Sequence, residues 1–371
     1  MVNYKAGMIA SLLVAVMLAG ALASYGIVGP TSREVTVTVA RTATEFRTEI
    51  RTETKLVTVS PTETLKKVTV GTLGPPSQSS WIVFIVEELG LDKKYGLDIE
   101  WVLQPSTTAL YQDFAAGKYK VSTGGMMTFA NMYLRGVPIK IFITYTLFGT
   151  AIIVNKERGP DVNSVKDLEG KIVAGPLTAE NLRAMQMYMR WLGADLSKIQ
   201  FQNFEHLAVP TELTSPTGRA VAGIAWETIP SRLELQDPAK FKVLYSIPEL
   251  DAVWQKNTGT QYHWLLGFAA YEEVIKADPD VLQKIYLIFR EATNYIRDFP
   301  DEAMKIIVKN TNISEELLKD AFNKGRLRFL VKPIHTEMNA VKQLFKVAND
   351  LGFINGIPDD NIFYKDLKII M

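Results

Sequence analysis

The sequence contains no cysteine and only three histidines, His206, His263 and His335. Without cysteine the chain has no disulfide, thiolate metal site, cysteine nucleophile or lipid-modified N-terminal cysteine. The histidines lack the short spacing of metal-ligand pairs, so we expect no metal site built from them. Gly-x-Ser-x-Gly, phosphate-binding-loop and His-Glu-x-x-His patterns are also missing. We therefore predict no catalytic residues, no metal and no cofactor, and an enzyme is the minority interpretation.

The sequence has 41 lysines and arginines and 40 aspartates and glutamates, so neither sign of charge is in excess. A balanced chain gives no reason to expect nucleic acid or an acidic polymer as a partner. The 371 residues are enough for two domains, and a hydrophobic content of 47% allows each a sizeable core.

Residues 1–30 predict an N-terminal signal or membrane anchor. Lys5 precedes an uncharged, mostly apolar stretch over residues 6–28, and about 20 such residues suffice to cross a bilayer. Ala21-Leu22-Ala23 also resembles a site where a secretory signal is cleaved. Retention and cleavage both fit the sequence. In either case we expect an extracytoplasmic protein, either anchored in the membrane by this segment at the cell surface or secreted.

Residues 31–66 differ in composition from the remainder. Threonine recurs throughout, interleaved with arginine, glutamate and valine, and large apolar side chains are scarce. Such a segment cannot bury enough apolar surface to form a core. We therefore expect a solvated stalk between the N-terminal segment and a folded unit that begins at residue 67.

From residue 67 onward, predicted strands alternate with predicted helices, which indicates an α/β fold with crossover helices. Strands are expected at residues 67–73, 97–101, 119–122, 139–144, 151–155, 171–174, 199–204 and 220–225. A mainly helical C-terminal part is expected, with helices at residues 279–297, 300–310, 314–324 and 336–351. Loops that follow parallel strands are where open α/β sheets bind ligands, so we look for the site there.

Gly124 and Gly125 lie between a predicted strand and a predicted helix. Glycine adopts positive φ readily and lets a bound group approach the backbone, so the pair suits a tight turn at a binding site. The first N–H groups of a helix lack partners within the helix and favour negative charge. Residues 175–180 repeat the same strand, glycine and helix order. Two such helix starts facing each other would hold a small molecule from both sides.

Several short segments occur in an order that resembles a known family. They include Val68-Thr-Val-Gly71, Glu87-Glu-Leu-Gly-Leu-Asp-Lys-Lys-Tyr-Gly-Leu-Asp-Ile-Glu100, Ala115-Ala-Gly-Lys118, Arg135-Gly-Val-Pro-Ile-Lys140 and Val165-Lys-Asp-Leu-Glu-Gly-Lys-Ile-Val173. Over residues 67–367 this order is similar to the periplasmic binding proteins that serve ABC transporters in the uptake of nitrate, sulfonates, taurine and thiamine precursors. The chain departs from that family at Lys120-Val121, where an acidic residue usually precedes the glycines, and at Ala222-Gly223, where Asp-Ala is usual. These departures weaken assignment to one substrate subfamily but not to the fold.

The resemblance implies a type II periplasmic-binding-protein fold with two α/β lobes joined by two crossing strands. Lobe 1 would comprise residues 67–148 and 268–371, and lobe 2 residues 149–267. The implied function is to capture a small molecule in the cleft between the lobes, close on it and deliver it to the permease of an ABC importer. The alternatives are a membrane-tethered extracellular enzyme and a sensory ectodomain with the same fold. A related eukaryotic group makes pyrimidines with this fold, but through cysteine and histidine motifs that are missing here.

On this resemblance the ligand is expected to contact residues from loops that follow the strands. The candidate ligand-binding residues are Ser79, Trp81, Gly124, Gly125, Met126, Thr146, Thr178, Ala179, Trp226, Glu227 and Trp264.

The composition of the loops expected around the cleft bears on the ligand. Residues 74–81, 124–128, 145–150, 176–181, 226–228 and 261–264 contain no lysine or arginine but do contain tryptophans and Glu227. A carboxylate in a semi-enclosed pocket opposes an anion and suits an amino-substituted ring that an aromatic side chain stacks on. We therefore rank a neutral or basic nitrogen heterocycle, such as a thiamine-type pyrimidine, slightly above an organic sulfonate, taurine or nitrate.

Overall fold

The computed structural model describes residues 35–39, 50–54, 65–177 and 179–369. The chain forms two units, residues 1–64 and residues 65–371, which are considered separately. In the first unit, β1 (Val35–Val39) pairs with β2 (Ile50–Thr54) in antiparallel register. The predicted signal or anchor and most of the predicted stalk lie outside the described residues. Among the helices that the structure describes, none is long and apolar enough to cross a membrane.

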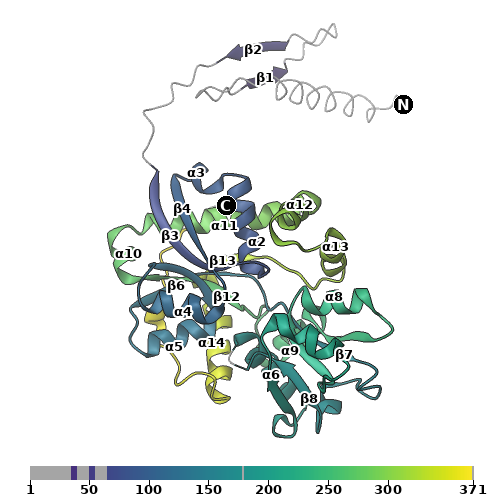
Figure 1. The fold of residues 1–371 in the computed structure, drawn as a ribbon. Helices are drawn as coiled ribbons and strands as arrows, with labels where there is room; N and C mark the ends of the chain where they lie inside the picture. The colour runs from purple at the N-terminus through teal and green to yellow at the C-terminus, as the bar shows by residue number, and fades with distance from the viewer. Residues whose placement is uncertain (1–34, 40–49, 55–64, 178, 370–371) are drawn as a thin grey trace, which may run out of the picture. The chain divides into compact units, whose positions relative to one another are not determined.

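The second unit contains a six-stranded mixed sheet (Figure 1). In order across the sheet, its strands are β13 (Val331–Pro333), β6 (Ile139–Tyr145), β12 (Leu266–Tyr271), β5 (Val121–Gly125), β3 (Lys66–Leu73) and β4 (Leu97–Gln104). β3 runs parallel to both β4 and β5, whereas β12 is antiparallel to β5 and β6. The carboxyl ends of β3, β4 and β5 therefore share one edge of the sheet, where α/β sheets bind ligands.

Helices cover both faces of this sheet. On one face α2 (Gln78–Glu88) and α11 (Asp280–Asp298) pack on the strands, and on the other α4 (Thr107–Ala115), α5 (Met126–Leu134) and α14 (Ile334–Asp350) do so. The helices α3 (Leu91–Lys94), α10 (Glu272–Ala277), α12 (Pro300–Thr311) and α13 (Glu315–Asn323) complete the arrangement, with α12 against α2 and α11. We call this sheet and these helices the six-stranded part.

A second sheet has five strands. Their order is β11 (Phe241–Tyr245), β7 (Thr150–Asn155), β10 (Ala222–Trp226), β8 (Ile172–Gly175) and β9 (Gln200–Asn203). The helices α6 (Glu180–Trp191) and α9 (Ile247–Thr258) pack on one face, and α7 (Val209–Thr214) and α8 (Ile229–Gln236) on the other. The alternation along β7 explains this, because Ile152 and Val154 point to the first face and Ile153 to the second. We call this the five-stranded part.

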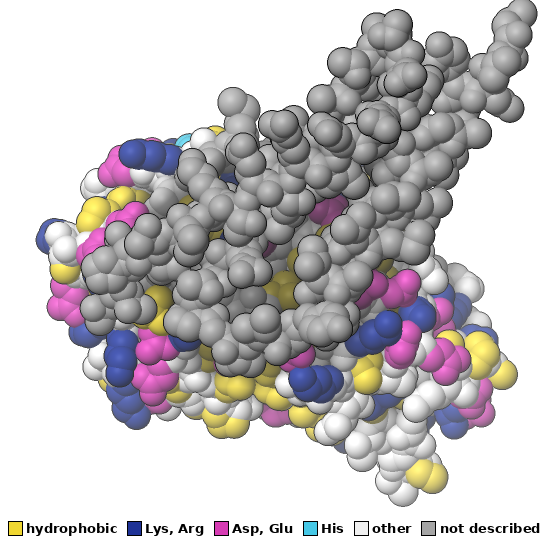
Figure 2. Space-filling model, turned by 90° about the horizontal axis from the view of Figure 1, so that it is seen from above, with side chains coloured by type: hydrophobic (Ala, Val, Ile, Leu, Met, Phe, Trp, Pro, Cys, Tyr) yellow, Lys and Arg dark blue, Asp and Glu magenta, His cyan; other side chains and the backbone are white. Residues whose placement is uncertain are grey.

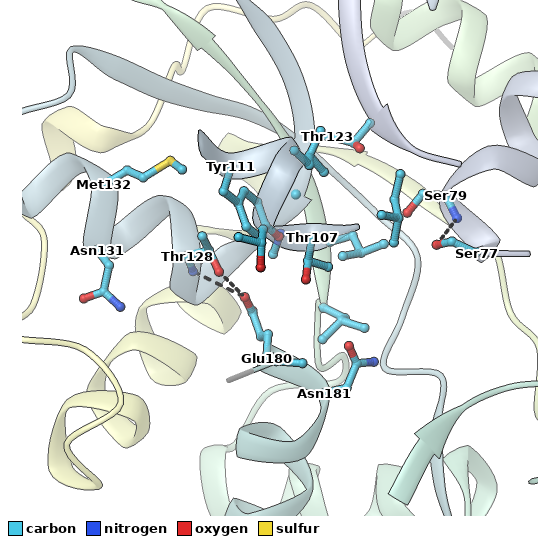
Figure 3. A pocket seen from close by; sticks show the side chains of 18 of the residues that line it. Ser77, Ser79, Thr107, Tyr111, Thr123, Thr128, Asn131, Met132, Glu180 and Asn181 are labelled. Atoms are coloured by element: carbon cyan, nitrogen blue, oxygen red, sulfur yellow. Dashed lines mark hydrogen bonds between the residues drawn. The ribbon is translucent and has the colours of Figure 1, made fainter. Parts of the chain in front are cut away.

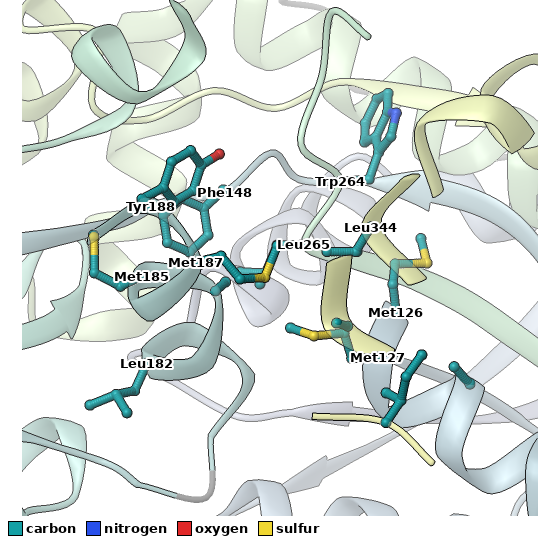
Figure 4. Packing of buried hydrophobic residues seen from close by; sticks show 14 of the residues in the cluster. Met126, Met127, Phe148, Leu182, Met185, Met187, Tyr188, Trp264, Leu265 and Leu344 are labelled. Carbon is teal, nitrogen blue, oxygen red and sulfur yellow. The ribbon is translucent and has the colours of Figure 1, made fainter. Parts of the chain in front are cut away.

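Two chain segments connect the parts and lie side by side. One runs from β6 to β7 and the other from α9 to β12, and they meet in an antiparallel bridge between Leu147 and Trp264. The N–H of Phe148 donates to the carbonyl oxygen of His263 at 3.1 Å, and the two rings stack with centroids 4.8 Å apart. Figure 4 shows Phe148 beside Tyr188 of α6, with Leu265 and the methionines of α5 nearby. The connection is thus packed into the core, and the lobe boundaries given above stay a prediction.

Charged side chains of both signs lie next to one another on the visible described surface (Figure 2). Many form exposed ion pairs, such as Lys94 with Glu291 and Lys309 with Glu88. Exposed pairs contribute little to stability, about 0–1 kcal/mol each. The predicted α/β class, with two sheets and a helical C-terminal part, is confirmed.

Candidate functional site

A cavity of about 450 Å³ is lined by residues of both parts (Figure 3). The six-stranded part contributes Leu73 at the end of β3, the segment from Ser77 to Ser79 at the start of α2, and Thr123, Gly124 and Gly125 of β5. The five-stranded part contributes Gly149, Ala179, Glu180, Asn181, Arg183 and Trp226. The cavity therefore lies at the carboxyl ends of strands from both sheets, where the sequence predicted a cleft.

The two glycines of β5 lie at this cavity for a different reason than the sequence suggested. They do not form a turn with positive φ, because both pair with β12 as the last residues of the strand and α5 begins directly at Met126. Gly125 has φ −73° and ψ 141°, which any residue adopts. What the site requires is the missing side chain. A Cβ on Gly125 would lie 1.9 Å from a carboxylate oxygen of Glu180.

The carboxylate that approaches Gly125 belongs to Glu180, the first residue of α6. Oε1 accepts from the N–H of Met127 at 3.0 Å, and Oε2 accepts from the N–H of Thr128 at 3.3 Å and from its hydroxyl at 3.2 Å. In Figure 3 the dashed lines between Glu180 and Thr128 show how the side chain of Glu180, from the five-stranded part, meets the start of α5. Burial of the carboxyl raises the pKa of Glu180 to about 7, although these donors and the charge of Arg183 act to lower it. The sequence interpretation had Glu180 only at the start of its own helix.

Six of the residues predicted to contact a ligand line the cavity. They are Ser79, Gly124, Gly125, Thr146, Ala179 and Trp226. Thr178 lies outside the described residues. Trp81, Met126, Glu227 and Trp264 do not line this cavity. Their side chains point into the protein core or hold neighbouring elements together.

Trp81 is fully buried and does not line the cavity, although Gln78 and Ser79 of the same helix do. Its indole N–H donates to the carbonyl oxygen of Pro76 at 3.2 Å, and its ring packs against Phe329 with centroids 6.0 Å apart. Met304 and Leu318 of α12 and α13 complete its surroundings. Trp81 was a candidate ligand contact in the sequence, but in the structure the C-terminal helices cover its ring and it does not line this cavity.

Trp264 and Met126 are also core residues. The indole N–H of Trp264 donates to Oε2 of Glu337 in α14 at 2.8 Å, and the residue is 1% exposed. Met126 packs over Gly267, where a Cβ would lie 2.3 Å from its terminal methyl carbon. Its N–H donates to the carbonyl oxygen of Leu265 at 3.1 Å. Both residues join the strand crossing to α5 and α14 rather than facing the cavity.

Glu227 follows β10 but is 1% exposed and lies behind the cavity wall. Its backbone joins the two parts, because its N–H donates to the carbonyl oxygen of Gly149 at 2.9 Å and its carbonyl oxygen accepts from the side-chain amide of Gln78 at 3.2 Å. Oε2 accepts from the N–H of Ser231 in the first turn of α8 at 3.3 Å. Burial raises the pKa of Glu227 to about 7. Its carboxylate therefore accepts from the first turn of a helix and does not line this cavity.

Two arginines line the cavity, although the six loops contain none. Arg135 follows the last residue of α5, and Arg183 lies in the first turn of α6. The guanidinium of Arg183 donates to the carbonyl oxygen of Phe353 at 3.4 Å and lies 6.0 Å from the centre of that ring. Its position could have been found from spacing, because residues three apart on a helix share a face and Arg183 is three residues after Glu180.

The remaining polar lining consists mainly of hydroxyl and amide groups. Trp226 adds an aromatic face, and the imidazole of His206 stacks on it with centroids 3.9 Å apart. The side-chain amide of Asn181 donates to the hydroxyl of Thr150 at 2.7 Å. Thr146 is 1% exposed, adopts φ 66°, and its hydroxyl has no hydrogen-bond partner within the described part of the chain. The site thus offers neutral donors and acceptors, an aromatic ring, a carboxylate and the two guanidinium groups of Arg135 and Arg183. The described residues include no group of three or more His, Asp or Glu side chains that could hold a metal ion.

The raised pKa of Glu227 predicts how stability depends on pH. A carboxyl that titrates near 4.5 when unfolded and near 7 when folded stabilises the fold below pH 4.5, and this contribution is lost as the pH rises through 7. We expect Glu227→Gln to remove this loss and to raise the free energy of unfolding at pH 8 by roughly 3 kcal/mol. Urea unfolding of the wild type and the variant at several pH values from 5 to 8 measures this change in the free energy of unfolding. A variant whose stability falls with pH as steeply as that of the wild type would contradict the assignment.

Comparison with known proteins identifies the family. The family described as NMT1/THI5 like matches residues 79–303, more than half of the chain. No curated protein matches the sequence.

Solved structures share the fold at low sequence identity. The periplasmic aliphatic sulphonate binding protein SsuA from Escherichia coli is 15% identical, covers 84% of this chain and 95% of its own, and has a TM-score of 0.67. The alkanesulfonate-binding protein SsuA from Xanthomonas axonopodis pv. citri, bound to MOPS, is 14% identical over 79% of this chain and 94% of its own, with a TM-score of 0.60. The ligand binding component of an ABC-type import system from Staphylococcus aureus is 12% identical over 80% and 96%, with a TM-score of 0.62. The resemblance seen in the sequence is confirmed: the chain belongs to the NMT1/THI5-like family and has the periplasmic-binding-protein fold.

Proposed function

We propose that this chain is the solute-binding protein of an ABC importer. It captures a small molecule in the cavity between the six-stranded and five-stranded parts and delivers it to a membrane permease. The family and the fold support this role, since a structural neighbour is the ligand binding component of an ABC-type import system. On this proposal the protein acts outside the cytoplasm, and residues 1–30 either anchor it in the membrane or direct its secretion.

The observation that carries the proposal is the composition of the cavity walls. Small-molecule sites are concave, measure about 300–1,000 Å³ and combine apolar surface with a few polar groups. The cavity of about 450 Å³ falls in this range, and Trp226, Thr146 and Glu180 supply an aromatic face, a free hydroxyl and a carboxylate. Because the walls come from both parts, a ligand there would contact both at once.

The tethered-enzyme alternative has less support. Catalysis needs a nucleophile with its base, a metal or paired carboxylates in one pocket. In the described walls of the cavity Glu180 is the sole carboxylate, and no histidine lines it. His206 and His263 are buried, and burial lowers the pKa of each to about 3, so neither is tuned for proton transfer near neutral pH.

For the ligand we propose a neutral or basic nitrogen heterocycle ahead of an organic sulfonate. The sequence argument for this order used Glu227 together with an aromatic ring, either Trp81 or Trp226, and of these three Glu227 and Trp81 do not line the cavity. Glu180 and Trp226 do line it and supply the same two kinds of contact, a carboxylate acceptor and a ring for stacking. The two SsuA proteins are described as sulfonate-binding, and we rank a heterocycle ahead of a sulfonate because Glu180 places a carboxylate in the cavity wall of this chain.

Mass spectrometry of the small molecule released when the purified protein is denatured tests this function. We expect one compound in near-stoichiometric amount, recovered chemically unchanged after rebinding. Release of a compound that the renatured protein converts to a product would favour the enzyme alternative. If no compound is released and none binds, the role as a sensory ectodomain with an empty cleft becomes the better account.

Ligand binding is expected to bring the two parts closer together, because two connecting segments allow hinge closure. The chain has no cysteine, so two introduced cysteines would be the only sites that take a spin label. Leu103→Cys and Leu177→Cys suit this purpose, because both positions are exposed and each lies near the end of a strand in a different sheet. We expect the released compound to shift the distribution of distances between these labels to shorter values or to narrow it. A pair within the six-stranded part, Leu103→Cys and Phe299→Cys, should not respond. Identical distributions with and without the compound for the first pair would rule out closure.

A further inference from the structure

The N–H groups at the start of α5 all have identified partners. Met126 donates to the carbonyl oxygen of Leu265, and Met127 and Thr128 donate to the carboxylate of Glu180. The preceding N–H, of Gly125, donates to the hydroxyl of Tyr111 at 2.8 Å. The start of a helix favours negative charge because its dipole and its free N–H groups point there. In this chain that position is filled by a side chain of the protein itself.

The contact between Glu180 and α5 is specific in shape. Glu180 comes from the five-stranded part and reaches Gly125, where any Cβ would collide with its Oε2. Gly125 has a backbone conformation open to other residues, so its lack of a side chain serves to make room for this carboxylate. The side chain of Glu180 also lines the cavity, which means that a ligand meets it directly.

The charge of Glu180 is not matched by a direct partner. Among the described residues, no lysine or arginine forms an ion pair with Glu180. Its carboxylate oxygens accept hydrogen bonds from two backbone N–H groups and one hydroxyl group. Arg183, the nearest cation on α6, donates to the carbonyl oxygen of Phe353. Arg135 lies beyond the other end of α5, about 13 Å from the helix start at 1.5 Å per residue. In its ionised form a carboxylate in this position repels an anion and attracts a hydrogen-bond donor or a cation.

We propose that Glu180 determines the ligand specificity of the cavity, because its carboxylate fills the position at the start of α5 that an anionic ligand would need. The cavity therefore rejects small sulfonates and carboxylates at this position and accepts a ligand that donates an N–H or carries a positive charge. This inference rests on the proposed binding function and names the ligand class for the same cavity. The buried hydroxyl of Thr146, which has no partner within the described residues, supplies a second polar contact for such a ligand.

Removing the carboxylate should create an anion site. We expect full-length Glu180→Ala to bind ethanesulfonate at least tenfold more tightly than the wild type by titration calorimetry, because the N–H groups of Met127 and Thr128 become available. Glu227→Gln is the matched control, since it alters a second carboxyl whose pKa burial also raises to about 7 but which does not line the cavity. It should bind ethanesulfonate no better than the wild type. Glu180→Ser vacates the same space and provides the measurement if the alanine variant does not fold.

The outcomes separate this inference from the proposed function. If Glu180→Ala and Glu180→Ser bind ethanesulfonate no more tightly than the wild type, the assignment of Glu180 is wrong, whatever else the protein binds. Release from the wild type of a compound whose polar groups are all anionic would also overturn it, while leaving the solute-binding role in place. A gain of ethanesulfonate binding in the variants supports the inference even if the wild type releases no compound, a result that would count against the proposed function instead.

Discussion

Replacing Gly125 with valine is expected to weaken binding of the natural ligand roughly 100-fold or more, about 2.7 kcal/mol, while the fold is retained. The φ of −73° and ψ of 141° at Gly125 suit valine, so the backbone need not move. The new side chain would occupy the space of the Glu180 carboxylate, whose Oε2 lies 1.9 Å from the position of the added Cβ. Glu180 would lose its three donors at α5, and the branched side chain would intrude into the cavity. Calorimetric titration of the ligand-free variant measures the loss.

Gly125→Ala provides a graded comparison, because its single methyl group meets the same oxygen but adds less bulk to the cavity. We expect its affinity to lie between those of the wild type and the valine variant. Circular dichroism and thermal unfolding establish that both variants fold. Wild-type affinity in a folded Gly125→Val variant would mean that the start of α5 is an ordinary strand-to-helix junction with no part in binding.

Replacing Trp81 with alanine is expected to lower the free energy of unfolding by about 3–5 kcal/mol, because it removes a fully buried indole from a packed core. The cavity left behind would lie among Phe329, Met304 and Leu318, and the carbonyl oxygen of Pro76 would lose its donor. Ligand affinity should change less than threefold, since the side chain does not line the site. Urea unfolding and calorimetry of the same preparation measure the two effects.

Trp226→Ala is the matched control and should show the opposite pattern. Trp226 is partly exposed and lines the cavity, so its loss removes the ring that we propose stacks on the ligand. We expect at least a tenfold loss of affinity with a smaller loss of stability than Trp81→Ala causes. If instead Trp81→Ala abolished binding in a folded protein, the sequence-based placement of Trp81 at the ligand would be correct and the present description of the site wrong.

The elements of the fold followed from local sequence patterns. The short apolar run of β7 and the 3.6-residue period of the apolar residues in α6 indicated a strand and a helix, because side-chain periodicity follows backbone geometry. Glycines also mark helix ends in the sequence: Gly90 follows α2 and Gly193 follows α6, and both have the positive φ that suits glycine there. Residues 229–258, which hold α8, β11 and α9, were not predicted as elements, since their polar and apolar residues give no clear period.

The orientation of side chains at the site was harder to obtain from the sequence. Ser79 and Trp81 are two residues apart on α2, and the helix turns one toward the cavity and the other into the core. Which face meets the C-terminal helices depends on residues more than two hundred positions away, and local spacing does not contain that information. Glu180 is a similar case, since its role depends on α5, which lies more than fifty residues earlier in the chain.

On the proposed function, the protein binds a small molecule in the cavity between its two sheets without changing it. Calorimetric titration of the full-length, ligand-stripped protein with the compound released on denaturation tests this most directly. We predict saturable binding with one site per chain, loss of that binding in Gly125→Val, and recovery of the compound unchanged. Binding of equal strength to the wild type and to a folded Gly125→Val variant, or conversion of the compound to a product, would contradict the account.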